Sequence, residues 1–211
     1  MSRCVILSAC PVQPELKRLL RSDDFIIACD AGYCNCERLG CKPDIIVGDF
    51  DSAPCPQQDS DDIVVLPHVK DDTDTEYAAK LAAQKGFHEV LLLGALGGKR
   101  VEHTLANLCT GLGLEQRGIR AALQDERSRI TFVLPGQSRS YPKEEFFYFS
   151  AFPMEGRAEG VCEKGSFYEL EDAVLTAGYP LGVSNEYAEG SDCITVSTRQ
   201  GALVVVETIA D

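Results

Sequence analysis

The sequence predicts an α/β protein made of two parts. Residues 1–125 are expected to form a mostly parallel, Rossmann-like sheet flanked by helices, and residues 126–211 an antiparallel β-sandwich. In the first part, short apolar runs alternate with helical patterns, which is typical of βαβ units with right-handed crossovers. In the second part, short β-rich runs follow one another between Gly, Pro, Asn and Ser, as in a sandwich.

The first part contains both strand and helix patterns. The predicted strands are Cys4 to Leu7, Phe25 to Ala28, Ile45 to Val47, Ile63 to Leu66, Val90 to Leu93 and Ala121 to Leu123. The predicted helices are Glu15 to Arg21, Tyr33 to Arg38, Thr75 to Gln84 and Thr104 to Gln116. Parallel strands need a crossover connection, and these helices supply it.

In the second part the pattern predicts strands alone, because no convincing amphipathic helix is present. The predicted strands are Ile130 to Leu134, Phe146 to Ala151, Gly160 to Glu163, Ser166 to Leu170, Cys193 to Ser197 and Ala202 to Thr208. The change of pattern places the boundary between the two parts near Gln124 to Arg129.

Composition and charge limit the classes of function. The chain has 211 residues, of which 45% are hydrophobic and 25% charged, as in an ordinary soluble globular protein. Its formal net charge of −13 argues against a sequence-independent nucleic-acid binder, which needs a basic face. No apolar stretch approaches the roughly 18 residues of a transmembrane helix, and no signal peptide is visible. We therefore expect a cytoplasmic protein that binds neither nucleic acid nor membrane.

The chain has 10 cysteines, most of them within apolar strands or helices. We interpret them as small buried thiols rather than as disulfide partners. The densest group is Cys29, Cys34, Cys36 and Cys41, which lacks the paired Cys-x-x-Cys spacing of a zinc site. A structural metal at this group is an open alternative.

Two clusters of acidic residues follow predicted strands. The first is Gly48-Asp49-Phe50-Asp51-Ser52, and the second is Lys70-Asp71-Asp72-Thr73-Asp74-Thr75-Glu76. Open α/β sheets bind ligands at the carboxyl ends of their strands. Carboxylates that converge there repel one another unless a cation lies between them, and oxygen ligands suit Mg²⁺ bound together with substrate phosphates. The clusters therefore favour a magnesium and nucleotide site, although Asp72 or Thr73 could instead cap the following helix.

A glycine-rich segment, Gly94-Ala95-Leu96-Gly97-Gly98-Lys99-Arg100, follows the fifth predicted strand. Glycines let backbone N–H groups approach phosphate oxygens, and the helix expected to begin near Thr104 offers a positive N-terminus. Lys99 and Arg100 add cationic donors. The spacing is not that of a P-loop. The segment indicates phosphate binding, with a plain tight turn as the alternative.

Three more polar residues are predicted at the same sheet edge. Asp30, in Asp30-Ala31-Gly32, follows the second strand, and Glu102 and His103 follow the glycine-rich segment. Glu102 is expected to face the carboxylates of Asp49 and Asp51. His103 is a candidate general base, although a single His at a helix start is more often a capping residue. If these residues were only helix caps, nothing would require them to gather at one edge of the sheet. Their common position therefore favours a ligand site.

The order of these motifs resembles that of the thiamin pyrophosphokinases. The resemblance rests on Asp30-Ala31-Gly32, Gly48-Asp49-Phe50-Asp51-Ser52, Lys70-Asp71 with Thr73-Asp74 and Glu76, Gly98-x-Arg100-x-Glu102-His103 with Asn107, and Ser184-Asn185-Glu186. It runs from about residue 1 to the C-terminus. Two positions depart from the family pattern: Glu102 stands where Asp is usual, and Ala31 stands where Gly is commoner.

The resemblance implies transfer of a pyrophosphoryl group from Mg-ATP to the hydroxyl of thiamin, giving thiamin diphosphate and AMP. It implies that Asp49, Asp51 and Asp71 bind Mg²⁺, and that Asp74 and Glu102 orient the metal's water shell or the thiamin hydroxyl. The residues that it assigns to ATP and its phosphates are Asp30, Lys70, Gly97, Gly98, Arg100, His103 and Asn107.

The resemblance assigns thiamin binding to the second part. Ser184 and Asn185 match the family's thiamin-contacting pair, although without the resemblance they would indicate an ordinary turn. The chain has no Trp, so Tyr179 or Tyr187 is the candidate for stacking on thiamin. The resemblance also suggests a homodimer whose sites combine the α/β part of one subunit with the sandwich of the other.

Two other functions stay open. A diphosphokinase acting on another alcohol, such as a hydroxymethyl-pterin, would share the metal and ATP motifs and would differ near Ser184 and Asn185. A catalytically silent module that binds nucleotide or Mg²⁺ is the second alternative, because Glu102 departs from the family pattern.

Overall fold

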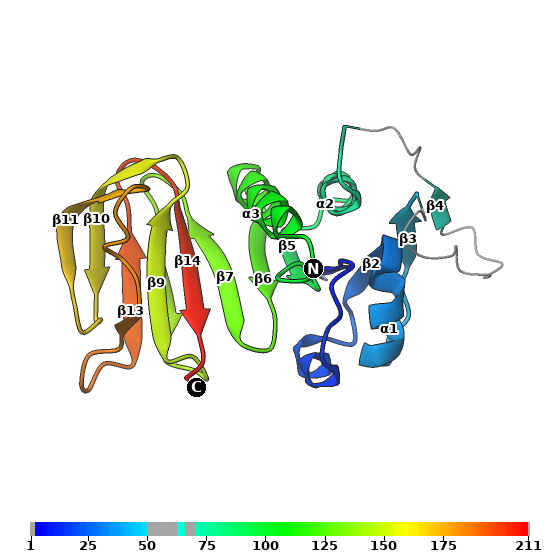
Figure 1. The fold of residues 1–211 in the computed structure, drawn as a ribbon, viewed down its shortest axis with the longest axis horizontal. Coiled ribbons are helices and arrows are strands. Elements are labelled where there is room, and N and C mark those ends of the chain that lie inside the picture. The colour runs from blue at the N-terminus through cyan, green and yellow to red at the C-terminus, as the bar shows by residue number, and fades with distance from the viewer. Residues whose placement is uncertain (1–2, 50–62, 66–70, 211) are drawn as a thin grey trace. The chain divides into compact units, whose positions relative to one another are not determined.

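The computed structural model describes residues 3–49, 63–65 and 71–210 (Figure 1). The chain divides into two compact units, Met1–Glu126 and Arg127–Asp211. Two predicted site residues, Asp51 and Lys70, lie outside the described residues.

The described residues of the first unit form a parallel sheet. Its strands are β1 (Cys4–Leu7), β2 (Phe25–Cys29), β3 (Ile45–Gly48), β4 (Ile63–Val65), β5 (Glu89–Leu93) and β6 (Arg120–Gln124). They pair in the order β6-β5-β1-β2-β3-β4, with every pairing parallel. The chain therefore builds the sheet on one side of β1 first and then continues on the other side. This reversal makes the edge between β1 and β5 a topological switch point, where such sheets bind ligands.

Helices cover both faces of this sheet. The 3₁₀-helix η1 (Pro14–Leu19) and the helix α1 (Tyr33–Leu39) pack on the face that buries Leu7 and Ala28. The opposite face presents Cys29, whose thiol donates to the carbonyl of Asp74, the first residue of α2 (Asp74–Gln84), at 3.6 Å. The helix α3 (Val101–Gln116) lies beside α2 (Figure 1). The predicted α/β class of this part is confirmed.

The second unit is an antiparallel sandwich. One group of strands pairs in the order β12-β9-β14-β7 and consists of β7 (Ser128–Val133), β9 (Tyr148–Pro153), β12 (Asn185–Glu186) and β14 (Leu203–Thr208). The other pairs in the order β11-β10-β13-β8 and consists of β8 (Ser138–Pro142), β10 (Arg157–Lys164), β11 (Leu170–Thr176) and β13 (Cys193–Ser197). Side chains from both groups, among them Phe149 and Ile194, form one buried core. The predicted sandwich is confirmed.

Two helices of the first unit differ from the prediction. The helix predicted from Glu15 to Arg21 is instead the short 3₁₀-helix η1, Pro14–Leu19, and 3₁₀ geometry is usual for such short pieces. The helix α3 begins at Val101 and not at Thr104. Val101 is exposed, so it lies outside the apolar pattern from which the start was predicted.

Two strands of the second unit also differ. The predicted strand from Ser166 to Leu170 is wrong, because β11 begins only at Leu170. The preceding residues form a turn in which the Asn185 side chain bonds to both the N–H and the carbonyl of Tyr168. The sequence does not predict β8, since Tyr141 is its only large apolar residue and the others are polar or Pro.

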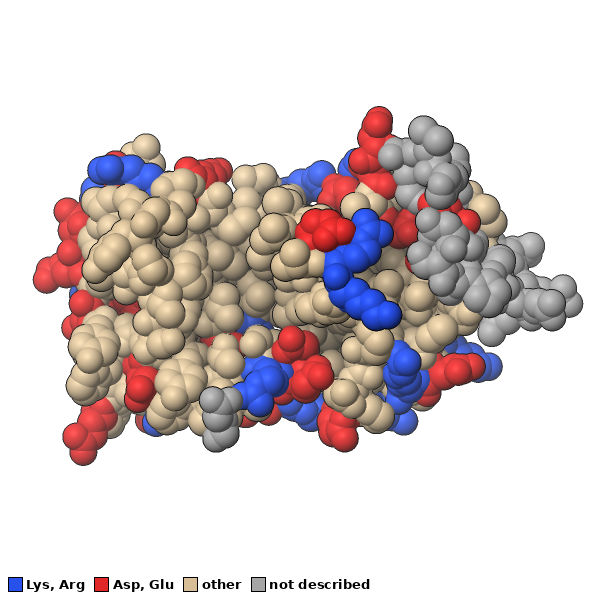
Figure 2. Space-filling view, in the orientation of Figure 1, with Lys and Arg blue, Asp and Glu red and all other residues tan. Residues whose placement is uncertain are grey.

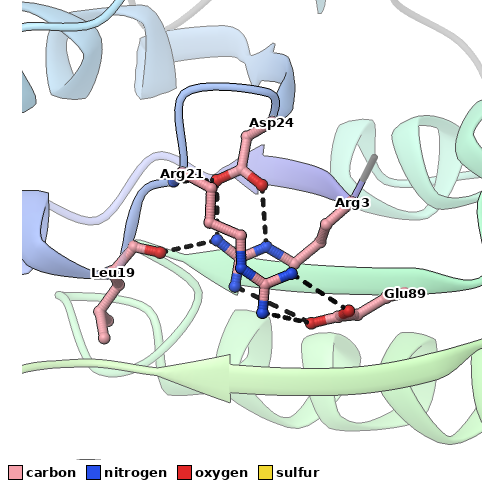
Figure 3. Close-up of polar contacts among 5 residues, drawn as sticks. All are labelled: Arg3, Leu19, Arg21, Asp24 and Glu89. Carbon is pink, nitrogen blue, oxygen red and sulfur yellow. Dashed lines mark hydrogen bonds and ion pairs between the residues drawn. The ribbon is translucent and has the colours of Figure 1, made fainter. Parts of the chain in front are cut away.

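A buried ion-pair network joins the amino ends of parallel strands (Figure 3). Arg3, directly before β1, donates to both carboxylate oxygens of Asp24, directly before β2, at 3.0 and 2.7 Å. It also donates to the carbonyl of Leu19 at 2.6 Å and lies 4.0 Å from Glu89, the first residue of β5. The side chain of Asp24 is 0% exposed, whereas Arg21 pairs with Glu89 at the surface. A bidentate Arg–carboxylate pair fixes geometry as well as charge, so the network aligns the starts of these strands.

We expect Asp24→Asn to lower the free energy of unfolding by about 3 to 5 kcal/mol, because the buried Arg3 guanidinium loses its anionic partner. Urea denaturation followed by far-UV circular dichroism measures this loss. The control is Arg21→Gln, which removes an exposed pair with Glu89 and should cost less than about 1 kcal/mol. Equal costs for the two variants would contradict the role of the buried pair.

Candidate functional site

The loop after β1 and the glycine-rich loop after β5 meet at the switch point. The Ser8 N–H donates to the Leu93 carbonyl at 2.8 Å, and the Cys10 N–H donates to the Gly94 carbonyl at 3.0 Å. The Cys10 thiol donates to the Gly97 carbonyl at 3.3 Å. The segment predicted to bind phosphate is therefore attached to the loop after β1 at Gly94 and at Gly97.

Asn35 of α1 holds the loop after β1 in shape, and its side chain is 0% exposed. Its Nδ2 donates to the carbonyls of Ser8 and Cys10 at 2.8 and 2.9 Å. Its Oδ1 accepts from the Val12 N–H at 3.2 Å and from the Arg38 guanidinium at 2.8 Å. Sequence reasoning missed Asn35. The sequence does contain one signal, an Asn on a short helix among residues that face the core. Because buried polar groups are almost always hydrogen-bonded, such an Asn is expected to hold nearby backbone groups.

Two glycines of the loop after β5 have the left-handed backbone that favours glycine. Gly97 and Gly98 have φ angles of 72° and 83°. A Cβ on Gly98 would lie 2.6 Å from the Cys10 sulfur, so a larger residue would displace the loop after β1. A Cβ on Gly97 would meet no described atom within 4 Å, and Gly97 is exposed. The exposed side of Gly97 is therefore open space, whereas its N–H and carbonyl are bonded to Thr104 and Cys10.

Side chains of α3 brace the same loop. The Thr104 hydroxyl accepts from the Gly97 N–H at 3.0 Å, and Asn107 Nδ2 donates to the Ala95 carbonyl at 2.7 Å. Asn107 is buried, so it supports the loop through this hydrogen bond and is not exposed to a ligand. His103 is half-buried in the first turn of α3, and its N–H donates to the Arg100 carbonyl at 3.0 Å.

Arg100 and Glu102 form an exposed ion pair at the start of α3. Arg100 Nε lies 2.7 Å from Glu102 Oε1, and the side chains are 69% and 60% exposed. The hydrogen bond from Arg100 lowers the pKa of Glu102 below its ordinary value. Glu102 is therefore a carboxylate at neutral pH, which suits it to orient a donor rather than to hold a proton.

Asp30 and Asp49 follow neighbouring strands. Asp30 begins the 3₁₀-helix η2 (Asp30–Gly32) directly after β2, and Asp49 directly follows β3. A Cβ on Gly48 would lie 3.1 Å from the Cα of Asp30 and 3.4 Å from its Cβ, so the two strand ends approach closely here. Asp30 is buried and has a φ of 46°, a backbone conformation that costs a residue with a side chain about 1 to 3 kcal/mol. Such strain clusters at functional sites.

The second acidic cluster begins α2, and part of it is structural. Thr73 caps the helix by accepting from the Glu76 N–H at 3.1 Å, so the capping alternative is correct for Thr73. Asp72 forms an ion pair with Lys80 at 2.6 Å. The Glu76 carboxylate accepts from Thr110 of α3 at 2.8 Å, which joins the two helices.

The start of α2 lies at the ends of β1 and β2. The Thr75 and Ser8 hydroxyls are 2.9 Å apart, and the Asp74 carbonyl accepts from the Cys29 thiol. Asp74 is thereby placed at the same sheet edge as Asp30. Asp71 is exposed directly before the helix.

The donor set at this edge fits Mg²⁺ chemically. Asp30, Asp49 and Asp74 bring carboxylates from two strand ends and a helix start, and carboxylate oxygens are the ligands that Mg²⁺ takes in proteins. Within residues 3–49, 63–65 and 71–210, no group of three His, Cys, Asp or Glu is arranged to hold a metal. Asp51, one of the predicted ligands, lies outside those residues. The assignment of Asp49, Asp51 and Asp71 to Mg²⁺ therefore stays a prediction.

In the second unit, Asn185 is an internal brace. Its Nδ2 donates to Glu163 Oε1 at 2.5 Å and to the Tyr168 carbonyl at 2.8 Å, and its Oδ1 accepts from the Tyr168 N–H at 2.9 Å. Its neighbour Ser184 is exposed with a φ of 54°, and the Ser184 N–H donates to the Ser150 hydroxyl at 3.0 Å. The two predicted thiamin residues thus differ in exposure.

The aromatic candidates for stacking also differ in exposure. The Tyr187 hydroxyl donates to the Pro142 carbonyl at 3.2 Å, whereas Tyr179 is exposed. Phe167 and Tyr168, in the turn that Asn185 holds, are exposed too, with ring centroids 4.8 Å apart. Sequence reasoning missed this aromatic pair because it placed both residues in a strand.

Glu163 is a buried carboxyl beside Asn185, with only 1% of its surface exposed. Burial raises its pKa to about 7, against the opposing effect of hydrogen bonds from Ser166 and Asn185. The carboxyl is therefore partly protonated near neutral pH.

Charge is balanced locally on the face shown in Figure 2. Lys and Arg side chains of the described residues lie there in small groups beside Asp and Glu. Such a surface suits a small anionic ligand bound by a few cations more than it suits a nucleic acid. No described helix is long and apolar enough to cross a membrane.

A parallel sheet with acidic and glycine-rich loops at its carboxyl edge, followed by an antiparallel sandwich, defines a class of two-unit α/β proteins that bind ligands at a switch point. Residues 16–123 match the family model of the thiamin pyrophosphokinase catalytic domain, and residues 140–203 match that of the thiamin pyrophosphokinase vitamin B1 binding domain. The chain belongs to the thiamin pyrophosphokinase family.

Solved structures of this family share the fold. The thiamine pyrophosphokinase of Bacillus subtilis is similar with a TM-score of 0.88 and 24% identity, covering 100% of both chains. That of Geobacillus thermodenitrificans has a TM-score of 0.85 and 26% identity, covering 100% of this chain and 98% of that one. The thiamin pyrophosphokinase of Candida albicans has a TM-score of 0.78 and 14% identity, and the match covers 98% of this chain and 89% of that one. Comparison with curated proteins found no match.

We expect Glu163 to make stability depend on pH. The carboxyl loses its proton near its ordinary pKa of 4.5 when unfolded and near 7 when folded, so the folded state binds more protons between these values. The free energy of unfolding of the wild type, relative to that of Glu163→Gln, should fall by about 3 kcal/mol as the pH rises from 4.5 to 7, and should then level off. Urea denaturation across this pH range measures the difference.

Glu159→Gln is the control, because Glu159 pairs with Arg157 at the surface. The difference in free energy of unfolding between Glu159→Gln and the wild type should not show this fall between pH 4.5 and 7. A pH-independent difference for Glu163→Gln would mean that Glu163 has the same pKa in the folded and the unfolded protein.

Proposed function

We propose that the chain transfers the pyrophosphoryl group of ATP to the hydroxyl of thiamin in the presence of Mg²⁺, giving thiamin diphosphate and AMP. The match of its two parts to the family's catalytic and vitamin B1 binding models is the observation that carries the proposal. The position of the glycine-rich loop at the switch point supports it independently.

The phosphates of ATP would bind at the loop after β5. Gly97 leaves open space on its exposed side for a phosphate, and the N-terminus of the 16-residue helix α3 favours negative charge. Arg100, exposed beside this loop, would donate to phosphate oxygens, with Lys70 as a second cation. Asn107 would support the nucleotide through the loop after β5, to which it is bonded. Asp30 would act from its place directly after β2, and His103 from the first turn of α3.

Asp49, Asp51 and Asp71 would hold Mg²⁺, which when bound neutralises charge on the transferring phosphates. Asp74 would support them from the start of α2, where its backbone is anchored to Cys29. The rigid strand ends at Gly48 and Asp30 would fix the direction of the Asp49 carboxylate.

Glu102 would orient the thiamin hydroxyl. Pyrophosphoryl transfer depends on in-line positioning and needs little covalent help from the protein. Glu102 is ionised and can accept a hydrogen bond from the hydroxyl, which directs the oxygen lone pair at the phosphorus. Its present partner, Arg100, is exposed, and exposed ion pairs exchange partners easily in water.

The second unit would supply the thiamin site. Ser184 is exposed and available for direct contact, whereas Asn185 would act by holding the turn that carries Phe167 and Tyr168. An aromatic face suits the flat rings of thiamin. We also propose a homodimer in the cytoplasm, which sedimentation of the purified protein and fractionation of cells test.

AMP formation tests the function. Purified protein with ATP and Mg²⁺ should release AMP when thiamin is added and much less without it, with thiamin diphosphate formed in equal amount. Release with a hydroxymethyl-pterin but not with thiamin would replace the proposal by a different diphosphokinase. No release with either alcohol would favour the silent nucleotide-binding module.

We expect Gly97→Ala to raise the KM for ATP about tenfold, because the new methyl group would occupy the space through which phosphates approach the backbone. Gly136→Ala is the matched control. Gly136 has a φ of 76°, and a Cβ there meets no described atom within 4 Å, so both changes strain the backbone alike. Steady-state kinetics should show an unchanged KM for the control. The same KM for both variants would remove Gly97 from the phosphate site.

We expect Glu102→Gln to lower kcat at least tenfold with a smaller effect on the KM for thiamin, because orientation matters most in the transition state. Glu102→Asp should retain much of the activity, since it keeps the charge. Glu159→Gln breaks an ion pair of nearly the same geometry, with Arg157 Nε 2.6 Å from Glu159 Oε1, and should leave kcat unchanged. A Glu102→Gln variant that turns over as fast as the wild type would exclude this role.

A further inference from the structure

Two cysteines meet at the C-terminal end of α1. The helix ends with Gly40 in the left-handed region, where the Gly40 N–H donates to the Glu37 carbonyl at 3.1 Å and the Cys41 N–H to the Cys36 carbonyl at 3.0 Å. This pair of bonds is a Schellman motif, in which the side chains at the positions of Cys36 and Cys41 commonly touch. The main-chain bond between them keeps the two residues side by side.

The side chains of this pair are in contact. Cys36 belongs to the buried core of the first unit, Cys41 packs against that core, and each thiol shifts the pKa of the other. Cys36 is 4% exposed, whereas Cys41 is half-buried. A reagent can therefore reach Cys41 first, with Cys36 behind it.

The surroundings assign different chemistry to the two sulfurs. The hydrogen bond from Cys36, with the positive charge of Lys17, lowers the pKa of Cys41, and a Cβ on Gly40 would lie 3.1 Å from Lys17 Nζ. The bond to Cys41 and burial raise the pKa of Cys36. A thiolate is the reactive form of cysteine, so Cys41 is the nucleophile of the pair.

We propose that Cys36 and Cys41 form a peroxide-sensitive dithiol that closes reversibly to a disulfide. The Cys41 thiolate attacks one oxygen of hydrogen peroxide, the O–O bond breaks, and the hydroxide that leaves takes up a proton to become water. The resulting Cys41 sulfenic acid is attacked by the Cys36 sulfur, which loses its proton as the S–S bond forms and a second water leaves. Two thiols are oxidised and one peroxide is reduced to two waters.

The geometry suits this bond better than it suits a metal. Disulfides need Cα atoms about 4.4–6.8 Å apart, and residues joined through their main chains at a helix cap stay close to each other. Among the described residues, no third His, Cys, Asp or Glu completes a metal site with these sulfurs. Cys34 is close in sequence and also acts on Cys36, so the test distinguishes a link to Cys34 from one to Cys36.

Peptide mapping tests the proposal on the full-length protein. The protein is treated with hydrogen peroxide at neutral pH, blocked with N-ethylmaleimide and digested with trypsin. Cleavage after Arg38 separates the two cysteines, so a disulfide between them holds two peptides together, and fragmentation identifies the linked sulfurs. We expect a Cys36–Cys41 link that dithiothreitol removes.

Serine variants supply the controls. Cys36→Ser and Cys41→Ser should slow formation of any disulfide at least tenfold, and Cys34→Ser should match the wild type. Cys109, an exposed thiol on α3, reports general oxidation within the same digest. Irreversible oxidation of Cys41 without a link, or a link from Cys41 to Cys34 or Cys55, would overturn the proposal. The mapping of the wild type decides this even if a variant fails to fold.

Discussion

The carboxyl edge of the first unit depends on one buried amide. Asn35 uses its Nδ2 and its Oδ1 to hold the loop after β1, and that loop in turn bonds to the glycine-rich loop after β5. An unsatisfied buried group costs about 1 to 3 kcal/mol, so a rearrangement of the loop that broke these bonds would be disfavoured. The switch point is therefore shaped before any ligand arrives, and a preformed site loses less ordering entropy on binding.

The two edges of the parallel sheet have different tasks. At the amino edge, Arg3 and Asp24 satisfy each other and are buried, which aligns the strands but leaves little to bind a ligand. At the carboxyl edge, Gly97 and Arg100 are exposed. The residues predicted to bind phosphate are thus accessible at one edge, and the buried ion pair lies at the opposite edge.

The parallel strands could be predicted from the sequence because they are apolar on both faces, and β1 has the predicted bounds. In the second unit, the antiparallel strand β13 also has the predicted bounds. The acidic and glycine-rich motifs could be predicted too, since strand ends and loops carry distinctive residues. The contacts of Asn35 could not, because they join residues far apart in the chain that no periodicity relates. The strand β8 could not be predicted either, since only Tyr141 of its residues is buried.

Two glutamates, one in each unit, have opposite pKa shifts because their environments differ. Glu102 is exposed beside Arg100, which lowers its pKa, so it offers a permanent charge to a ligand. Glu163 is buried beside Asn185, and burial raises its pKa to about 7, so it offers a neutral or weakly charged anchor for a turn. The same residue type is thus an exposed, permanently charged group in the first unit and a buried partner of a turn in the second. Only their surroundings distinguish the two carboxyl groups, which is why residue type alone could not predict the raised pKa of Glu163.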